Sequence, residues 1–333
     1  MVPAIDHVAV LGAGGWGTAF ALLLADAGRS VSLWARDPRV ADAINIERRN
    51  ERRLPGIELP VQVRATADRS AAVADADAVV VALPSQTVRA NMTGWALPRG
   101  VPVVSLAKGL EEGTGLRMSR VLAECGVAPD QIAVLSGPNL ADEIGRREPA
   151  SAVVAAAEHD LAVDIQRACH GPNFRAYTST DVTGVEVGGV TKNSIAIAVG
   201  MAIGLGLGAN AVAALTTRGL AESTRLGEAM GADPLTFQGM AGMGDLVATC
   251  FSPLSRNRSF GVELGRGVAV EAALAHGRGV VEGARSTPVV AQVAGGVGVD
   301  MPVVSTVCDV LAGLLTPAEA LERAMARELK PER

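Results

Sequence analysis

The chain has 333 residues, of which 49% are hydrophobic and 20% are charged, so it is long enough for two domains with a substantial core. A net charge of -5 and an aromatic content of 3% offer neither a basic face for phosphates nor platforms for stacked bases, which argues against nucleic acid as a partner. The four cysteines have no paired spacing and the N-terminus shows no export signal, so we expect a cytoplasmic protein.

Short apolar runs rich in β-branched residues alternate with helix-like segments in the first half of the chain. We expect strands at residues 7–11, 30–34, 77–83, 101–107 and 131–136, with 151–157 as a further candidate. Continuous apolar strands separated by helices are typical of a parallel sheet covered on both faces. The sequence therefore predicts the α/β class, with a doubly wound Rossmann-type domain.

Beyond about residue 184 the β-rich runs stop, and Ala, Gly, Leu and Met recur at helical spacing. We therefore expect a dinucleotide-binding domain at 1–184 and an all-helical substrate-binding and dimerisation domain at 185–333. The stretch 193–217 has no charged side chain and is as long as a membrane span. Its glycines and the lack of an aromatic belt favour two soluble helices that break near "GLGLGAN", so no membrane insertion is expected.

Gly12, Gly14 and Gly17 form a GxGxxG pattern directly after the first expected strand and at the start of an apolar helix. The first glycine permits a tight turn, the second lets backbone N–H groups approach a pyrophosphate, and the third lets the helix pack closely on the strand. With a second strand ending at the expected offset, the pattern predicts dinucleotide binding. A glycine-rich turn of some other α/β protein is the alternative.

The second expected strand ends in "LWARD", where an acidic residue would bind a ribose 2′-hydroxyl and an arginine a 2′-phosphate. Arg36 precedes Asp37, so both groups are present. We expect NADPH or NADH as the cofactor, with NADPH preferred. The alternative is an exposed turn with an incidental charge pair.

Four later motifs place polar residues where helices or strands are expected to end. They are Lys108 in "SLAKGLE", Asn139 in "LSGPNLADEI", Lys192 and Asn193 in "VTKNS", and Asp245, Ser255, Arg256 and Asn257 in "GDLVATCFSPLSRNR". Together with "GAGGWGTAFA", "LPSQTVR", "TRGLAESTRLG" and "VVEGARST", these motifs resemble the bacterial-type NAD(P)-dependent glycerol-3-phosphate dehydrogenases over almost the whole chain. The resemblance implies interconversion of dihydroxyacetone phosphate and sn-glycerol 3-phosphate, a supply of phospholipid backbone, and a homodimer.

The same resemblance implies roles for individual residues. Lys192 matches the catalytic acid/base, and Lys108 matches a lysine between cofactor and substrate. The substrate site is implied to contain Gly137, Asn139, Asn193, Asp245, Ser255 and Asn257, and the cofactor site Gly15, Trp16, Arg36, Ala141, Val280 and Glu282, with Arg256 shared by both ligands. Two positions depart from the family pattern: Asn139 stands where Ser or Thr is common, and Ile203 where Asp is common.

The chemistry of the residues supports these roles. Reduction of a ketone by hydride makes an alkoxide, which requires a proton donor beside the carbonyl oxygen. Lys192 sits before an uncharged apolar helix, where burial and a second cation can lower its pKa toward neutrality. The alternative is a helix-terminal lysine that reaches solvent.

Each of the other polar motifs allows two interpretations of its role. Asp245 could hold Lys192 or a substrate hydroxyl, or it could merely cap the next helix. Arg256 and Asn257 are typical of a phosphate clamp at a helix start, and a solvated loop is the alternative. The four histidines have no metal-binding spacing, so no metal is expected.

Two other functions compete with this hypothesis. A 3-hydroxyisobutyrate or 6-phosphogluconate dehydrogenase has the same two-domain plan, but places its lysine several residues ahead of its asparagine, whereas Lys192 and Asn193 are adjacent. A non-catalytic dinucleotide sensor would not need Lys192 or Arg256.

Overall fold

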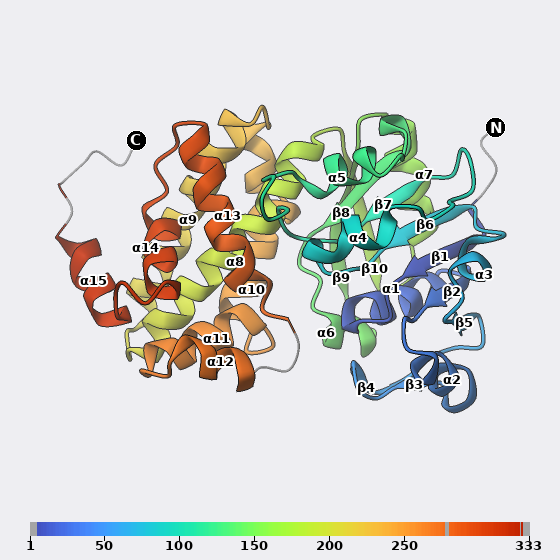
Figure 1. Cartoon of the computed structure of the whole chain (residues 1–333), viewed down its shortest axis with the longest axis horizontal. Coiled ribbons are helices and arrows are strands. Elements are labelled where there is room, and N and C mark those ends of the chain that lie inside the picture. The colour runs from blue at the N-terminus through green and yellow to red at the C-terminus, as the bar shows by residue number, and fades with distance from the viewer. Residues whose placement is uncertain (1–4, 277–279, 327, 329–333) are drawn as a thin grey trace.

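Two lobes lie side by side along the long axis of the molecule, one built on a sheet and the other on helices (Figure 1). The computed structural model describes residues 5–276, 280–326 and 328. The last strand ends at Ser179 and the helix that opens the second lobe begins at Val182. Among the described residues, everything after that point is helix, turn or loop, so the predicted α/β domain followed by a helical domain is confirmed.

An eight-stranded sheet forms the first lobe, in the order β10-β9-β8-β7-β6-β1-β2-β5. All six expected strands are present. The strands of this sheet are β1 His7–Leu11, β2 Ser30–Trp34, β5 Val63–Thr66, β6 Ala78–Val81, β7 Val103–Ser105, β8 Ile132–Ser136, β9 Ala150–Ala156 and β10 Phe174–Ser179.

The sheet is mostly parallel, but β9 pairs antiparallel with β8, with Ala133 opposite Ala156 and Ser136 opposite Val153. The link between them contains only the short helix α6 (Ala141–Gly145), so the chain turns back along its neighbour instead of crossing to the other end of the sheet. β10 then pairs parallel with β9 through α7 (His159–Cys169). A fully parallel sheet was therefore a wrong expectation for these two strands.

Sequence patterns missed the two edge strands and a small hairpin. β5 and β10 alternate buried with more exposed residues, so neither forms a continuous apolar run. The hairpin of β3 (Arg49–Asn50) and β4 (Leu54–Glu58) is short and largely exposed. It lies beyond α2 (Pro38–Glu47), at the edge of the lobe in Figure 1.

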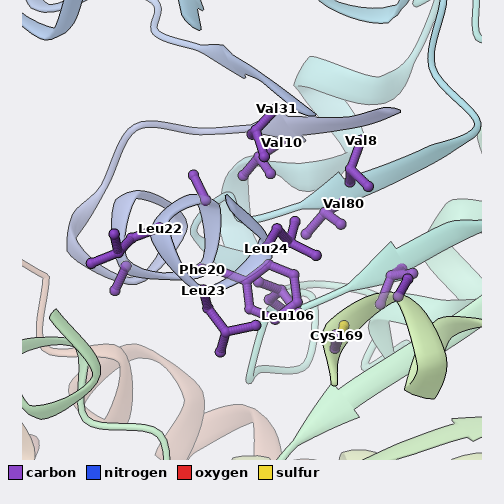
Figure 2. Close-up of a cluster of buried hydrophobic side chains, with 14 of the residues drawn as sticks. Val8, Val10, Phe20, Leu22, Leu23, Leu24, Val31, Val80, Leu106 and Cys169 are labelled. Carbon is purple, nitrogen blue, oxygen red and sulfur yellow. The ribbon is translucent and has the colours of Figure 1, made fainter. Parts of the chain in front are cut away.

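The sheet is buried on both faces. Successive side chains of its central strands point to opposite sides, so each strand contributes residues to two apolar clusters. Val8 and Val10 of β1 join one apolar cluster, and Ala9 and Leu11 join another. Figure 2 shows the first cluster, in which Phe20 of α1 packs beneath the strands. The helices of this lobe are α1 Gly15–Asp26, α2, α3 Arg69–Val73, α4 Val88–Met92, α5 Met118–Glu124, α6 and α7.

Helix α8 (Val182–Gly204) is the central element of the second lobe. It meets the length and apolarity of a membrane span, with a mean hydropathy of 1.3, but 89% of that window is buried inside the protein. The expected break follows, because Gly206 has a φ of +82° and α9 begins at Ala209. The other helices here are α9 Ala209–Ala229, α10 Asp245–Phe251, α11 Arg256–Gly265, α12 Val270–His276, α13 Glu282–Gly296, α14 Pro302–Leu311 and α15 Pro317–Met325.

Glycines let α8 and α11 pack at backbone distance. A Cβ on Gly200 would lie 2.9 Å from Cα of Gly261, and a Cβ on Gly204 would lie 2.8 Å from Cα of Gly265. Any larger side chain at these positions would force the helices apart. This contact fixes the start of α11, and with it Arg256 and Asn257, against the middle of α8.

Candidate active site

The predicted cofactor turn lies between β1 and α1. Gly12 has a φ of +122°, and a Cβ there would lie 2.6 Å from the carbonyl oxygen of Ala82. A Cβ on Gly17 would lie 2.9 Å from the Cβ of Ala82, whereas one on Gly14 would meet nothing within 4 Å. The backbone turn therefore requires glycine at 12 and 17, and the space before the helix N-terminus stays open to an anion.

Trp16 and Ala141 both lie close to this turn. A Cβ on Gly15 would be 3.9 Å from the Cβ of Ala141, the first residue of α6. The Trp16 ring packs edge-on against Phe20, and its Nε1–H is buried with no acceptor in the described part of the chain. The first backbone N–H groups of α1 favour an anion, and the buried Trp16 N–H is a further donor for a ligand to satisfy, so these residues fit an NAD(P) cofactor.

The end of β2 separates the roles of Arg36 and Asp37. The Asp37 carboxylate caps α2 by accepting from the Arg39 backbone N–H at 3.1 Å, and it pairs with the Arg39 guanidinium at 3.0 Å. These contacts hold the pKa of Asp37 below its usual value. Arg36 is exposed beside them, so at this tip the carboxylate is already engaged and the arginine faces solvent.

Two lysines meet on one buried carboxylate. Asp245, the first residue of α10, is only 1% exposed. Lys108, from the loop after β7, donates to Asp245 Oδ2 at 2.6 Å and to the carbonyl oxygen of Gly137 at 2.9 Å. Lys192 donates to Asp245 Oδ1 and, at 2.8 Å, to Thr249 Oγ1. Four predicted site residues from distant parts of the chain, Lys108, Gly137, Lys192 and Asp245, are therefore joined by direct hydrogen bonds.

Lys192 lies in the interior of α8, so the expectation that it precedes the apolar helix was wrong. The helix starts at Val182, where Asp181 accepts from the Gly184 backbone N–H at 2.8 Å. No proline interrupts the chain between that cap and Lys192. The uncharged stretch after Lys192 reflects burial of the second half of α8, and it does not mark where the helix begins.

Burial and a second cation act on Lys192 as the sequence suggested. Desolvation lowers the pKa of Lys192 to about 8, an effect that Asp245 opposes and that Lys108 reinforces. With a pKa of about 8, a substantial fraction of Lys192 is in each protonation state slightly above neutral pH, so the side chain can give or take a proton.

Two adjacent glycines of α8 make room for this cluster. A Cβ on Gly189 would lie 2.7 Å from Ser136 Oγ and 3.6 Å from Cγ of Lys108, so its absence lets the Lys108 stem pass over the helix. A Cβ on Gly188 would lie 2.7 Å from the carbonyl oxygen of Ala241. Ala241 belongs to the π-helical turn Met240–Gly244, which leads into Asp245. Such turns often occur at functional sites.

The start of α11 is tied to α8 and α13 by asparagines. Ser255 caps α11 by accepting from the Arg258 backbone N–H at 3.2 Å. Asn257 donates through Nδ2 to Asn193 Oδ1 at 2.8 Å, and its Oδ1 accepts from the Gly283 backbone N–H at 2.9 Å. Asn257 therefore contacts Asn193, the residue that follows Lys192 in the chain.

Arg256 is exposed at the first position of α11, outside the hydrogen-bonded lysine cluster. The charges that act on it belong to Glu282 of α13, Arg53 of the β3–β4 hairpin and Asp142 of α6, so it faces the cofactor lobe. Glu282 accepts from Ser85 Oγ at 3.0 Å across the two lobes, and burial raises the pKa of Glu282. Val280, just before this helix, is 41% exposed.

The two departures from the family pattern lie in different surroundings. Asn139 donates through Nδ2 to the Ser151 carbonyl at 3.1 Å, which leaves its buried Oδ1 without a donor among the described residues. Ile203 packs in the apolar contact of α8 with α9, far along the helix from Lys192. The structure therefore puts Asn139 beside Gly137 and leaves Ile203 outside the cluster.

Sequence reasoning missed Thr249 and Ser136, which also contact the cluster. Thr249 follows Asp245 by four residues on α10, a helical spacing that could have identified it. The Ser136 hydroxyl lies 3.4 Å from Asp245 Oδ2, and no local pattern indicates it. A further signal was available in the composition: only three of the 30 basic residues are lysines, namely Lys108, Lys192 and Lys330.

A glycine turn on a Rossmann sheet, joined to a helical lobe that adds a lysine and a carboxylate, defines a two-domain nucleotide-dependent oxidoreductase. Family models for the N-terminus and C-terminus of NAD-dependent glycerol-3-phosphate dehydrogenase match residues 7–162 and 181–322. The chain belongs to this family.

Individual relatives agree with that assignment. The glycerol-3-phosphate dehydrogenase [NAD(P)+] of Streptomyces avermitilis is 52% identical over 328 residues, which is 98% of each chain. That of Thermobifida fusca is 53% identical over 333 residues, 99% of each chain. A crystal structure of glycerol-3-phosphate dehydrogenase from Coxiella burnetii matches with a TM-score of 0.92 at 36% identity, over 98% of this chain and all of that one.

We predict that Asp245→Asn destabilises the protein by about 3 to 5 kcal/mol, the usual cost of removing one partner from a buried ion pair. It should also move the pKa of Lys192 further below about 8, because the carboxylate that opposes desolvation is gone. Denaturant unfolding and NMR of labelled lysine Nζ atoms measure these effects, and with three lysines in the chain the signals can be assigned.

The control is Glu124→Gln, which removes an ion pair with Arg89. The Glu124 side chain is 54% exposed, so this pair lies at the surface. Exposed pairs contribute about 1 kcal/mol or less. If the two variants lose equal free energy of unfolding, the buried Asp245 pair contributes no more to stability than an exposed ion pair.

Proposed function

We propose that this chain interconverts dihydroxyacetone phosphate and sn-glycerol 3-phosphate with Lys192 as the general acid and base. The observation that carries the proposal is the buried contact of Lys192 and Lys108 with Asp245, at the end of the sheet that holds the glycine turn. NAD(P)H, when bound, supplies the hydride. Lys192 then gives its Nζ proton to the oxygen of the former carbonyl, and in glycerol 3-phosphate oxidation it takes that proton back.

The remaining site residues hold the substrate around this proton. Lys108 neutralises charge beside the reacting oxygen, and Asp245 orients both ammonium groups. Arg256 carries a planar fork of donors suited to a phosphate, at a helix N-terminus where an anion is favoured. The other proposed substrate contacts are Gly137, Asn139, Asn193, Ser255 and Asn257.

The proposed cofactor site uses the glycine turn together with Arg36 and the first residues of α6 and α13. Its members are Gly12, Gly14, Gly15, Trp16, Gly17, Arg36, Lys108, Ala141, Arg256, Val280 and Glu282. Because Asp37 is engaged with Arg39 and Arg36 is exposed, we propose a preference for NADPH over NADH.

We further propose that the enzyme works in the cytoplasm as a homodimer and supplies glycerol 3-phosphate for phospholipid synthesis. The family resemblance and the unpaired cysteines Cys125, Cys169, Cys250 and Cys308 support this setting. Residues 1–184 would bind the cofactor, and 185–333 would bind the substrate and the second subunit. Light scattering tests the dimer.

Lys192→Ala should lower kcat by at least about 100-fold, since a general acid typically contributes that much. Cofactor affinity should change little.

In the wild-type enzyme, glycerol 3-phosphate oxidation should rise with pH through about 8, because only the neutral amine accepts a proton, and the reduction should fall over the same range. Stopped-flow and steady-state rates from pH 6 to 10 measure both. A Lys192→Ala variant that turns over near the wild-type rate would remove Lys192 from the mechanism.

Arg36→Ala should weaken NADPH more than NADH, because only NADPH carries the 2′-phosphate that a guanidinium can bind. Fluorescence titration with each cofactor gives the two affinities. Arg64→Ala, an exposed arginine on the neighbouring edge strand β5, is the control for the loss of one positive charge. Equal losses for both cofactors would show that Arg36 does not bind the 2′-phosphate.

Arg256→Ala should reduce kcat/KM for dihydroxyacetone phosphate by roughly 10- to 200-fold, which corresponds to a charge-assisted contact of about 1.5 to 3 kcal/mol. Unphosphorylated dihydroxyacetone lacks the phosphate, so its low kcat/KM should fall much less. Both substrates are compared at saturating NADPH. If both slow by the same factor, the phosphate is bound elsewhere and Lys108 becomes the next candidate.

A further inference from the structure

The loop that carries Lys108 is folded back on itself before it reaches α5. Leu110 and Arg117 form an antiparallel bridge, and the Glu111 N–H donates to the Leu116 carbonyl at 2.9 Å. These bonds connect the start of the loop, where Lys108 lies, to its end at Arg117. A displacement of Arg117 is therefore transmitted to the backbone around Lys108.

The end of this loop is fastened to α8 by Glu186. The Glu186 carboxylate accepts from Arg117 Nη1 at 2.5 Å, from the Ser119 N–H at 2.8 Å and from Ser119 Oγ at 2.6 Å. The Glu186 side chain is 7% exposed and that of Arg117 is 17% exposed, so the contact is shielded from water. Charge-assisted bonds of this kind are strong and well oriented.

Glu186 and Lys192 lie on the same helix, six residues or about 9 Å apart along its axis. Lys108 reaches the same carboxylate as Lys192, passing beside Gly189 between them. α8 thus holds both the end of the Lys108 loop and the Lys192 side chain. The distance between the two ammonium groups depends on both attachments.

We propose that Glu186 is a positioning residue, which with Arg117 and Ser119 fastens the Lys108 loop to α8 so that Lys108 and Lys192 share Asp245. The proposal rests on the function proposed above for Lys192. Among the described residues, neither Glu186 nor its two partners makes a hydrogen bond or ion pair with the Asp245 carboxylate, so Glu186 acts through the loop.

The charges that face Lys192 allow this role to be separated from simple stabilisation. Lys108 reaches it from the β7–α5 loop and Asp245 from α10. Cys250, also on α10, remains a neutral thiol because burial raises its pKa to about 12. Withdrawal of the Lys108 cation would raise the pKa of Lys192, and a carboxylate no longer shared would raise it further.

The test is Glu186→Gln in the full chain, with Glu222→Gln as the matched control. Glu222 is another buried carboxylate, 2% exposed, which accepts from the Val303 and Val304 N–H groups at the start of α14. Its contacts lie within the helical lobe. Both variants should lower Tm, and only Glu186→Gln should alter the lysine pair.

Glycerol 3-phosphate oxidation is followed from pH 6 to 10. Glu186→Gln should move the midpoint of the rise to higher pH by about 0.5 unit or more and reduce kcat about 10-fold, with KM for the cofactor unchanged. Glu222→Gln should keep the wild-type midpoint. If Glu186→Gln keeps the wild-type midpoint and kcat, or Glu222→Gln shifts the midpoint equally, the proposal is overturned.

Amine labelling read by mass spectrometry gives a result independent of the proton role of Lys192. The Lys108 side chain is 16% exposed, so its labelling relative to Lys330 should increase several-fold in Glu186→Gln and not in Glu222→Gln. Unchanged Lys108 labelling would contradict the proposal even if Lys192 proves to be the acid. Conversely, increased labelling with no ionisation near pH 8 in the wild type would retain the positioning role and reject the function proposed for Lys192. If Glu186→Gln does not fold, Ser119→Ala removes one donor and should give a smaller change in the same direction.

Discussion

The arrangement of this protein depends on one buried carboxylate, Asp245, which binds an ammonium group from each lobe. A lone buried charge is costly, and a carboxylate that holds two lysines offsets part of that cost through short, charge-assisted bonds. Lys108 comes from the loop that follows a sheet strand, and Lys192 comes from the middle of α8. The relative placement of the two lobes is therefore also the geometry of the proposed reaction centre.

Glycines supply the close approaches that this placement needs. Just before Lys192 on α8, Gly188 and Gly189 admit the π-helical turn that precedes Asp245 and the stem of Lys108. Near the C-terminal end of α8, Gly200 and Gly204 face glycines of α11, which brings the Arg256 helix start alongside Asn193. The helix therefore makes close backbone contacts both before and after Lys192. An apolar helix of this composition resembles a membrane span in sequence, yet its surface is covered by its own fold.

The two ligands proposed for the site would meet at a boundary that the lobes share. The glycine turn, Trp16 and Arg36 belong to the sheet lobe, whereas Asn193, Asp245 and Asn257 belong to the helical one. Ser85 and Glu282 connect the lobes by one hydrogen bond, and Glu186 connects them by three. A residue such as Glu186 can thereby influence proton transfer without touching a ligand, because it determines where Lys108 is held.

Local patterns by themselves determined much of the molecule. The six apolar strands, the glycine turn at Gly12 and Gly17, the break after α8 and the capped start of α11 each follow from residues close together in the chain. Two further features, the engagement of Asp37 by Arg39 and the position of Lys192 inside a helix capped by Asp181, also depend on nearby residues, but the patterns did not reveal them. Only the tertiary structure decided that β9 turns back along β8. Only the tertiary structure, likewise, brought Lys108, Asp245 and Thr249 to Lys192. These outcomes depend on contacts between segments up to 137 residues apart, where burial and charge pairing act, and no periodicity along the chain records which distant side chains will meet.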